Sequence, residues 1–459
     1  MKVMSTSGAT LRRLRRDAEA VFRAGLEAVD PVEAVKRHLT LSHDVLAADG
    51  RTYDLQRFER ILVVGAGKAS AAMAQAAEDV LGDRIQDGWI NVKYGHTLPL
   101  RRVRLHEAGH PVPDAAGWQG AQSMEAMLRR SGPRDLVLCL LSGGGSALLP
   151  YPVEGVKLEE KQELTRLLLE SGAAIQEINT LRKHVSRIKG GRLARMAHPS
   201  PLISMILSDV IGDDLDSIAS GPTVPDRSTF EDCLEILGRL SLSGRIPQSV
   251  LRHLEKGARG EVEETPKHED PTFQNTFEII VASNILALQE ARRKAEALGY
   301  HTLLLSSFVE GETREVARVH AAIAKEILQT GNPIPRPACF LSGGETTVTI
   351  VGRGLGGRNQ EFALAAALEI DSLENVVVLS AGTDGTDGPT DAAGAWADGL
   401  TVTRARTLGM DPPRFLRDND SHRFFAALED LFVTGPTLTN VMDLRVVVVG
   451  PLPASIHHP

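Results

Sequence analysis

Short apolar runs alternate along this chain with longer stretches in which apolar and polar residues recur at helical spacing. Runs rich in Val, Ile and Leu predict strands at 61–65, 135–142, 202–209, 277–283, 338–342 and 375–382. Because these runs are apolar on both faces, they predict buried parallel strands, and the helical stretches between them predict doubly wound sheets. The expected fold class is therefore α/β.

The domain division follows from length and from one break in this alternation. A chain of 459 residues is too long for one ordinary core, so two domains are expected. The stretch between Ser243 and Gln274 is polar, charged and rich in proline, which is typical of a linker or peripheral loop. We therefore expect domains at 1–245 and 275–459, joined by a linker at 246–274.

Composition narrows the class of partner. The chain has 51 basic and 59 acidic residues, and a net charge of -8 argues against nucleic acid as the main partner. A small anion needs only a local cluster of cations, so a small anionic ligand stays possible.

The cysteines and the apolar runs indicate the compartment. Cys139, Cys233 and Cys339 form no CxxC pair, which favours a reducing compartment. No apolar run reaches membrane-spanning length, and the basic N-terminus is interpreted as the start of an amphipathic helix. We expect a cytoplasmic protein with small-molecule substrates and no membrane or nucleic-acid partner; a homodimer stays open.

The first strand that ends in a glycine turn carries candidate phosphate chemistry. In VVGAGKAS at 63–70, Gly65 and Gly67 let backbone amides approach an anion at a helix N-terminus, and Lys68 lies beside them. Ser70 replaces the third glycine of the dinucleotide fingerprint, and Leu62 replaces the first glycine of the P-loop. The alternative is a tight turn with a solvated lysine.

The second glycine turn follows the strand at 135–142. Successive glycines are costly in chain entropy and offer no packing, so a close anionic ligand is the favoured explanation, against a flexible turn. Serine hydroxyls flank the glycines as donors. The predicted cradle consists of Ser142, Gly143, Gly144, Gly145 and Ser146.

Two further segments of the first half add charge. Arg182 and Lys189 share one face of the helical stretch at 178–194, next to the Gly190-Gly191 pair, although such a stripe can be merely solvated. Asp209 and Asp213 follow a buried strand, where carboxylates suit Mg²⁺; an acidic loop that caps a helix is the alternative.

The second half repeats this pattern loosely. Glu345, Arg358 and Asn359 flank a glycine-rich turn within 343–365, and the fork of Arg358 suits an anion. The loop at 380–395 supplies Asp384 and Asp387, either of which could be a base or a metal ligand. The order SGG, GGR, an aspartate loop and GPT occurs in both halves, through duplication or by coincidence.

One motif is misleading. HEAGH at 106–110 matches the zinc-protease pattern HExxH, which works only on a helix. Gly109, Pro111 and Pro113 favour an extended segment instead, which argues against a metalloprotease.

Eight blocks together resemble the class II glycerate kinases, the family with a C-terminal MOFRL domain. They are VVGAGKAS, HPVPD, LLSGGGSALL, INTLRKHVSRIKGGRLA, SDVIGDDLDSIASGPT, LSGGETTVT, GGRNQE and SAGTDGTDGPTDAAGA, in the family's order from about Leu11 to Gly450. The resemblance implies a Rossmann-like N-terminal domain, a smaller α/β C-terminal domain and an active site in the cleft between them. It also implies phosphoryl transfer from ATP, with Mg²⁺, to D-glycerate, giving 2-phosphoglycerate.

On this resemblance, the family's residues for activity match Lys68, Arg358 and Asp384. Lys68 and Arg358 would share the transferring phosphoryl group and the glycerate carboxylate, and Asp384 would accept the hydroxyl proton or hold Mg²⁺. The glycine loops at 142–146 and 343–344, together with Gly65 and Gly67, would bind nucleotide phosphates, and Asp209 or Asp213 would serve the metal. The remaining assignments are phosphate contacts by Gly343, Gly344, Glu345 and Thr346, and substrate contacts by Arg182, Lys189, Asn359 and Asp387.

Two rival functions stay open. The near-fingerprint GAGKAS suggests an NAD(P)H-dependent hydroxypyruvate reductase, although no acidic ribose-binding residue ends a second strand at the expected distance. The other rival is a non-catalytic sensor of a phosphorylated ligand.

Overall fold

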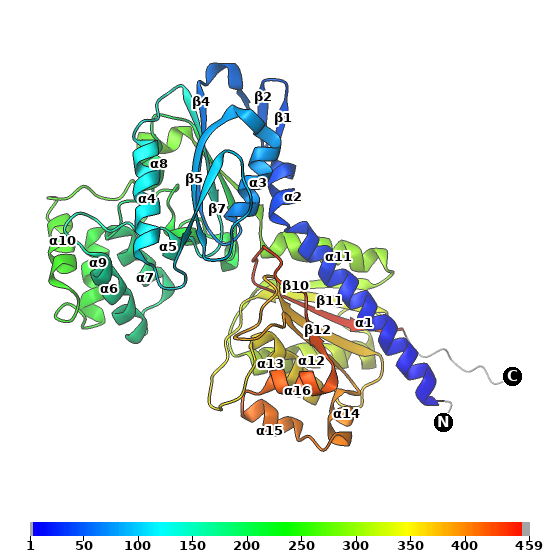
Figure 1. Cartoon of the computed structure of the whole chain (residues 1–459). Coiled ribbons are helices and arrows are strands. Elements are labelled where there is room, and N and C mark those ends of the chain that lie inside the picture. The colour runs from blue at the N-terminus through cyan, green and yellow to red at the C-terminus, as the bar shows by residue number, and fades with distance from the viewer. Residues whose placement is uncertain (1–2, 452–459) are drawn as a thin grey trace. The chain divides into compact units, whose positions relative to one another are not determined.

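The computed structural model describes residues 3–451 and divides the chain into two compact units (Figure 1). One unit consists of residues 31–281, and the other combines the chain up to Asp30 with the chain from Ala282 on. Each unit has its own central sheet and its own core, and each is described by itself below.

The 31–281 unit is built on a six-stranded sheet with the order β6-β5-β4-β7-β8-β9. Numbered along the chain, this order is 3-2-1-4-5-6, the Rossmann arrangement, and the pairs from β6 to β8 are parallel. The predicted strands at 61–65, 135–142, 202–209 and 277–283 are thereby confirmed. The strands are β4 (Arg60–Ala66), β5 (Ile85–Lys93), β6 (Val103–Ala108), β7 (Asp135–Leu141), β8 (Leu202–Leu207) and β9 (Thr276–Ala282).

Helices cover both faces of this sheet, as its two-sided apolar strands require. Figure 1 shows α4 and α8 on one face and α3 on the other. A small antiparallel sheet, β1-β2-β3, precedes β4. The bounds are α2 (Pro31–His38), β1 (Leu39–Ser42), β2 (Val45–Ala48), β3 (Arg51–Asp54), α3 (Ser70–Leu81), α4 (Ala115–Leu128), α5 (Gly145–Leu148) and α8 (Arg192–Ala197).

A separate helical layer in the same unit has its own apolar core. It consists of α6 (Leu158–Glu170), α7 (Ile175–His184), α9 (Phe230–Arg239) and α10 (Gln248–Ala258). The structure therefore differs from the expected linker at 246–274, because Val250 and Leu254 of α10 are fully buried in this core. A side chain on Gly257 would collide with the Phe230 ring, so α10 packs closely on α9. Because Val250 and Leu254 stand among polar residues in the sequence, the helical pattern of α10 was not recognised.

The second unit has a mixed sheet with the order β10-β11-β15-β12-β13-β14. Only the β10–β11 pair is parallel, and the other pairs are antiparallel. The predicted strands at 338–342 and 375–382 are confirmed, but the expectation of a doubly wound parallel sheet is wrong here. The strands are β10 (His301–Val309), β11 (Ala338–Gly344), β12 (Val376–Gly382), β13 (Gly394–Asp398), β14 (Leu431–Phe432) and β15 (Asp443–Val449).

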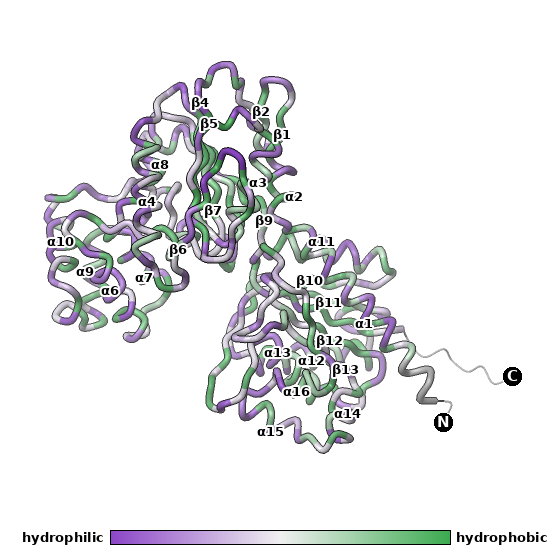
Figure 2. Tube along the Cα trace, viewed as in Figure 1, coloured by the Kyte–Doolittle hydropathy of each residue, from purple (hydrophilic) through white to green (hydrophobic). Residues whose placement is uncertain are grey.

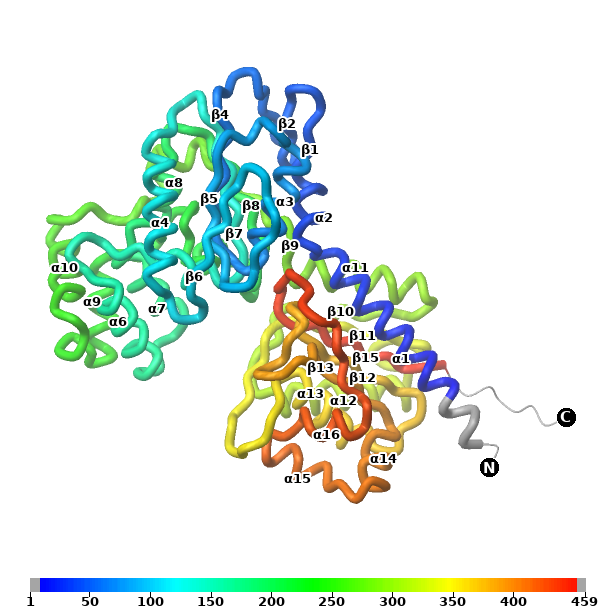
Figure 3. The backbone as a smooth tube through the Cα atoms, in the orientation of Figure 1, coloured from blue at the N-terminus to red at the C-terminus, as the bar shows by residue number. Residues whose placement is uncertain are grey.

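The N-terminal helix joins this second unit. Figure 3 shows α1 beside α11 across the sheet, and Ala287 and Ala291 of α11 lie close to Gly25 of α1. Because the apolar face of α1 packs here, the boundary falls at Asp30 and again at Val281, instead of at 245 and 275. The helices are α1 (Val3–Ala28), α11 (Asn284–Ala297), α12 (Thr313–Thr330), α13 (Arg358–Glu369), α14 (Thr401–Thr407), α15 (Pro412–Arg417) and α16 (Ser421–Leu428).

The hydropathy of the two units follows their sheets. Figure 2 shows hydrophobic residues along the central strands, and every residue of β7, β11, β12 and β15 is buried. The three cysteines are buried and unpaired. Within residues 3–451, no helix has both the length and the apolar character needed to cross a bilayer.

Candidate active site

The switch point of the first sheet lies between β4 and β7, where the strand order reverses. In open α/β sheets, ligands bind at the carboxyl ends of the strands at this point. Two of the predicted glycine turns meet there, because the Lys68 amide donates to Gly143 O at 2.9 Å. The predicted phosphate turns at 63–70 and 142–146 therefore form one local structure.

Gly67 is needed for this close approach. Its φ of +150° is unfavourable for other residues, and a Cβ atom at this position would collide with the Ser142 hydroxyl. That hydroxyl accepts the Ala69 amide at 3.0 Å and lies 3.1 Å from the Ser70 hydroxyl. The start of α3 is thus fixed to the loop after β7.

The other glycines of these turns have a packing explanation within the protein. A side chain on Gly65 would collide with Leu140 O, and one on Gly143 would collide with the Asp209 carboxylate. A Cβ atom on Gly145 would lie 2.8 Å from that of Ala219. The sequence argument that only a ligand requires these glycines is therefore too strong, and their contact with phosphate remains a prediction.

Lys68 lies in a positively charged environment that is partly shielded from water. Its side chain is half-buried, and within residues 9–451 its ammonium forms no ion pair. Burial lowers the pKa of His110 to about 4, and the charges of Lys68 and Lys93 add to the effect. Burial also lowers the pKa of His96, whose Nδ1 lies 3.3 Å from Lys68 O. Both imidazoles are therefore neutral near pH 7, and the local charge is that of the lysines.

Three further basic side chains gather behind the glycine loop. Lys189 is fully buried, and its ammonium donates to Ser146 O at 2.9 Å and to Ala219 O at 3.3 Å. Burial lowers the pKa of Lys189 well below its usual value, and Lys161 and Arg182 lower it further. Burial likewise lowers the pKa of Lys161 to about 7. Within residues 9–451, none of the three side chains forms an ion pair with a carboxylate. Because burial favours the neutral form of Lys161 and Lys189, the guanidinium of Arg182 is the lasting positive charge beside the loop.

Ser146 connects this group of basic side chains to α7. Its hydroxyl lies 2.7 Å from that of Ser220, and the Ser220 hydroxyl donates to Asn179 Oδ1 at 3.2 Å. Asn179 and Arg182 are three residues apart on α7, so they face the same side of the helix. The structure thus brings Lys68, Ser142–Ser146, Arg182 and Lys189 into one region of the unit.

The two predicted metal ligands differ in position. Asp209 lies against Gly143, at the anion loop, whereas Asp213 lies farther along in a short turn with a φ of +56°. Within residues 9–451, no group of three or more His, Cys, Asp or Glu side chains could hold a metal ion. The binding of Mg²⁺ by Asp209 or Asp213 remains a prediction, and Asp209 is the better placed because it lies at the anion loop.

The second group of candidates lies in the other unit, where strands β11 and β12 end. Strand β15 runs between them in the opposite direction, so its first residue, Asp443, pairs with Gly344 on one side and Gly382 on the other. Gly344 has a φ of +115°, and a side chain there would collide with Val309 O. The turn after β11 is therefore restricted to glycine by its neighbours.

Arg358, the first residue of α13, is held by two carboxylates. Its Nε and Nη2 donate to the buried Asp443 at 2.8 and 3.0 Å, and its Nη1 lies 2.8 Å from Glu345 Oε1. Burial alone would lower the pKa of Arg358, but Asp443 and Glu345 raise it above its usual value. A guanidinium has five N–H groups, so two remain for a ligand. The side chain is 31% exposed.

Asn359 and Asp387 are buried inside this arrangement. Asp387 accepts the amides of Asn359 and Gln360 at 3.0 and 2.8 Å and so caps α13. Burial raises its pKa to about 6 although the two amides oppose the shift. Asn359 donates to Asp443 at 2.8 Å and accepts from Ser380 at 2.6 Å. These contacts position Arg358, and the predicted substrate contacts of both residues remain predictions.

The other predicted residues of this unit range from buried to exposed. The Thr346 hydroxyl is buried and binds Thr313 and Arg445, whereas Glu345 is exposed. Asp384 is half-buried, and its Oδ1 accepts the Thr386 amide at 3.0 Å and the Thr386 hydroxyl at 3.1 Å. Its other oxygen has no hydrogen bond within residues 9–451 and is available to a substrate.

Sequence reasoning missed His96, Lys161 and Asn179 in the first group of residues and Asp443 in the second. Asp443 had a usable signal, because it stands shortly before the valine run at 446–449. His110 stood in the HEAGH motif, and the expectation of an extended segment there is confirmed. His106 lies in β6 and its Nε2 is 2.8 Å from Ala116 O.

Comparison with known proteins agrees with this arrangement. The model of a domain of unknown function, DUF4147, matches residues 17–255, and the MOFRL family model matches residues 338–443. The chain is 41% identical over 433 residues to the D-glycerate 2-kinase of Thermotoga maritima, covering 94% of this chain and 97% of that one. The chain belongs to the class II glycerate kinase family.

The crystal structure of a glycerate kinase from Thermotoga maritima shares this fold. Its TM-score is 0.86 at 40% identity, over 95% of this chain and 100% of that one. A protein of Agrobacterium vitis with the name "Putative hydroxypyruvate reductase" is 43% identical over 393 residues, covering 85% of this chain and 87% of that one. Relatives of this glycerate kinase family thus carry two different names, so the chemistry of the site has to separate them.

Proposed function

We propose that this protein transfers the γ-phosphoryl group of ATP to the 2-hydroxyl group of D-glycerate, which yields 2-phosphoglycerate and ADP. The observation that carries the proposal is the position of Lys68. It stands at the switch point of a Rossmann sheet, between two joined glycine turns, and its ammonium has no carboxylate partner within residues 9–451. A cation held in this way is suited to a phosphoryl group or a carboxylate.

The reaction asks the protein for positioning and charge neutralisation, because phosphoryl transfer involves little covalent chemistry by side chains. The glycerate oxygen forms a bond to the γ-phosphorus while the bond from that phosphorus to the ADP oxygen breaks. Lys68 and Arg358 neutralise the transferring group and the glycerate carboxylate between them. Asp384 accepts the proton of the attacking hydroxyl through its available oxygen.

Mg²⁺ fits this arrangement in one way. Magnesium in kinases is usually held by one or two carboxylates together with the nucleotide phosphates. Asp209 meets that requirement, because its carboxylate lies against Gly143 in the proposed phosphate loop. A bound Mg²⁺ ion would neutralise charge on the phosphates.

The two groups of residues belong to different units, Lys68 to the 31–281 unit and Arg358 to the other. The proposed partners are the small molecules ATP and D-glycerate alone. We further propose the cytoplasm as the location, which the three unpaired and buried cysteines support.

The reductase alternative has less support from the fold. A dinucleotide-binding Rossmann unit places an acidic residue near the end of its second strand, where it binds the ribose. Here that strand, β5, ends in Asn91-Val92-Lys93. Neither Asn91 nor Lys93 is acidic.

The direct test is ADP release from ATP, Mg²⁺ and D-glycerate, followed by enolase. Because enolase accepts 2-phosphoglycerate directly, we expect phosphoenolpyruvate without any added mutase. A product that needs mutase would move the phosphorylation to the 3-hydroxyl. Oxidation of NADH by hydroxypyruvate, without ADP release, would overturn the kinase proposal in favour of the reductase. Thermal stabilisation by ATP and glycerate without turnover would favour a sensor.

Arg182 gives a prediction that separates function from stability. Burial lowers its pKa, and within residues 9–451 it has no carboxylate partner, so it destabilises the fold unless an anion binds. We expect Arg182→Gln to raise the KM of one anionic substrate about tenfold. The melting temperature should stay the same or rise. Initial rates and thermal unfolding measure both, with the exposed Arg245→Gln as the control. An unchanged KM for both substrates would remove Arg182 from the site.

A further inference from the structure

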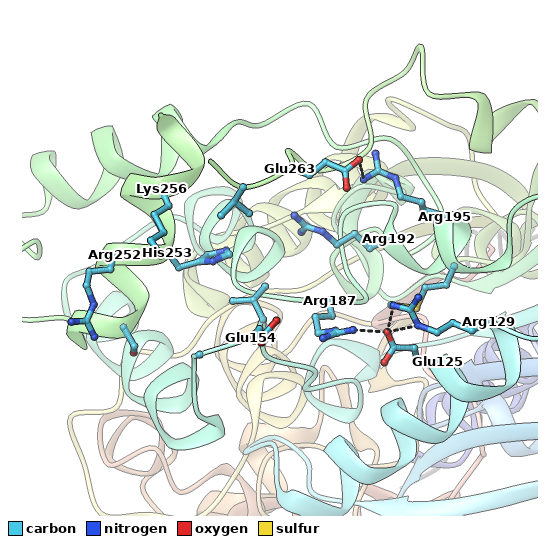
Figure 4. Close-up of a pocket in the computed structure, with 15 residues that line it drawn as sticks. Glu125, Arg129, Glu154, Arg187, Arg192, Arg195, Arg252, His253, Lys256 and Glu263 are labelled. Carbon is cyan, nitrogen blue, oxygen red and sulfur yellow. Dashed lines mark hydrogen bonds and ion pairs between the residues drawn. The ribbon is translucent and has the colours of Figure 1, made fainter. Parts of the chain in front are cut away.

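A cavity of about 840 Å³ lies in the 31–281 unit, and no residue of the two glycine turns lines it (Figure 4). Helices α4, α8 and α10 form its walls together with the segments at 153–155 and 262–263. None of the residues assigned above to ATP, glycerate or metal lines it. Its volume is within the range of small-molecule sites, roughly 300–1,000 Å³.

The lining of this cavity is strongly basic. Three carboxylates, Glu125, Glu154 and Glu263, face six cations. The six are Arg129, Arg187, Arg192, Arg195, Arg252 and Lys256. Figure 4 shows α10 contributing cations on one side, and Arg187, Arg192 and Arg195 contributing on the other. The cavity therefore carries a net positive charge on two opposed walls.

The carboxylates pair with only some of the six cations that line the cavity. Glu125 pairs with Arg129 at 2.8 Å and Arg187 at 2.7 Å. Arg195 pairs with Glu263 at 2.9 Å and with Asp270 at 2.6 Å. Arg252 and Lys256, which are exposed on α10, form no ion pair within residues 9–451. Their charges are therefore open to a ligand.

Arg192 is the most constrained of the six. Its Nη1 donates to Lys183 O at 2.9 Å and to Ser186 O at 3.0 Å, and no carboxylate in the described chain pairs with it. Burial and the charge of Arg195 lower its pKa to about 10, although the charges of Glu264, Asp226 and Glu263 oppose the shift. Two carbonyl groups thus hold a partly dehydrated guanidinium in a fixed orientation, an arrangement that an anionic ligand would stabilise.

We propose that this cavity binds a small organic molecule with at least two phosphate groups. Cations on two walls match two separated anionic groups better than one. Val153, Met196 and Val262 also line the cavity and offer an apolar surface to a carbon skeleton. The site is separate from the proposed catalytic one, so the inference does not depend on the reaction proposed above.

The test is calorimetric titration of the full-length protein with inorganic pyrophosphate, in the absence of Mg²⁺. Arg252→Gln/Lys256→Gln removes two exposed charges from the cavity, so the fold should be retained. Arg245→Gln/Lys294→Gln removes two exposed charges elsewhere and is the matched control. We expect the cavity variant to weaken binding on the order of tenfold and the control to bind like the wild type.

Pyrophosphate could also bind beside Lys68, and the variant Lys68→Ala distinguishes the two sites. Binding that survives Lys68→Ala but is weakened in Arg252→Gln/Lys256→Gln supports the cavity. Arg192→Lys, which keeps the charge but loses the guanidinium fork, should also weaken it. The proposal is overturned by absent binding at millimolar pyrophosphate, by equal weakening in the control, or by binding that only Lys68→Ala removes.

Discussion

Replacing Lys68 by alanine is expected to lower turnover on the order of 10²–10³-fold while the protein stays folded. The rate should fall because the ammonium neutralises charge that develops on the transferring group or anchors the carboxylate beside it. Stability should change little, since within residues 9–451 this side chain forms no ion pair that the fold would lose. The neighbouring imidazoles of His96 and His110 are neutral near pH 7 and do not replace the lost charge.

Steady-state kinetics with ATP and D-glycerate would measure this effect, with thermal unfolding as the check on the fold. Lys294→Ala, an exposed lysine on α11, is the matched control. A fall in kcat with unchanged KM for glycerate would assign Lys68 to the phosphoryl group. A fall in kcat/KM carried by the KM for glycerate would assign it to the carboxylate. Near-normal turnover of the alanine variant would remove Lys68 from the mechanism.

The sequence predicted the strands well because buried apolar runs are a local property. All six predicted runs are strands, and the parallel direction of strands β6 to β8 in the first sheet follows from the alternation with helices. Strand direction in the second sheet was not predictable in the same way. A buried strand is apolar on both faces whether its neighbours are parallel or antiparallel, and β15 enters between β11 and β12 from the far end of the chain.

The domain boundary failed for a related reason. The polar stretch around 246–274 looked like a linker, yet Val250 and Leu254 bury one side of α10 in the helical layer. The first helix has no sequence signal that says which unit it joins. Its partner α11 begins more than 250 residues later, and such a long-range contact is invisible to local patterns.

Like the fold, the candidate site residues were predicted only in part from the sequence. Lys68 and the loop at 142–146 were predicted from glycines at strand ends, and the structure places them together. The same glycines were attributed to a ligand, although Leu140, Asp209 and Ala219 already require several of them. The sequence of one loop does not show which other loop packs against it. For the same reason Asp443, which holds Arg358, was not connected to it before the fold was known.

Arg358→Lys is expected to lower kcat/KM on the order of 10²-fold or more, even though the positive charge is kept. Arg358 uses three N–H groups to hold its position against Asp443 and Glu345, which leaves two for a ligand. A lysine ammonium has three donors on a flexible stem. It can pair with Asp443 or reach the substrate, but it does not present a fixed fork to both. Because the pair with Asp443 survives in part, the fold should be retained.

Guanidinium rescue tests this geometry more sharply than the loss of rate alone. In Arg358→Ala, the space between Asp443 and the substrate should admit a free guanidinium ion, and millimolar guanidinium should restore part of the activity, whereas methylammonium should not. Arg353→Lys, an exposed arginine on the preceding loop, is the matched control and should act like the wild type. If Arg358→Lys kept near-normal kcat/KM, a point charge would suffice at this position. The two donors left open by Asp443 and Glu345 would then have no role in the transfer.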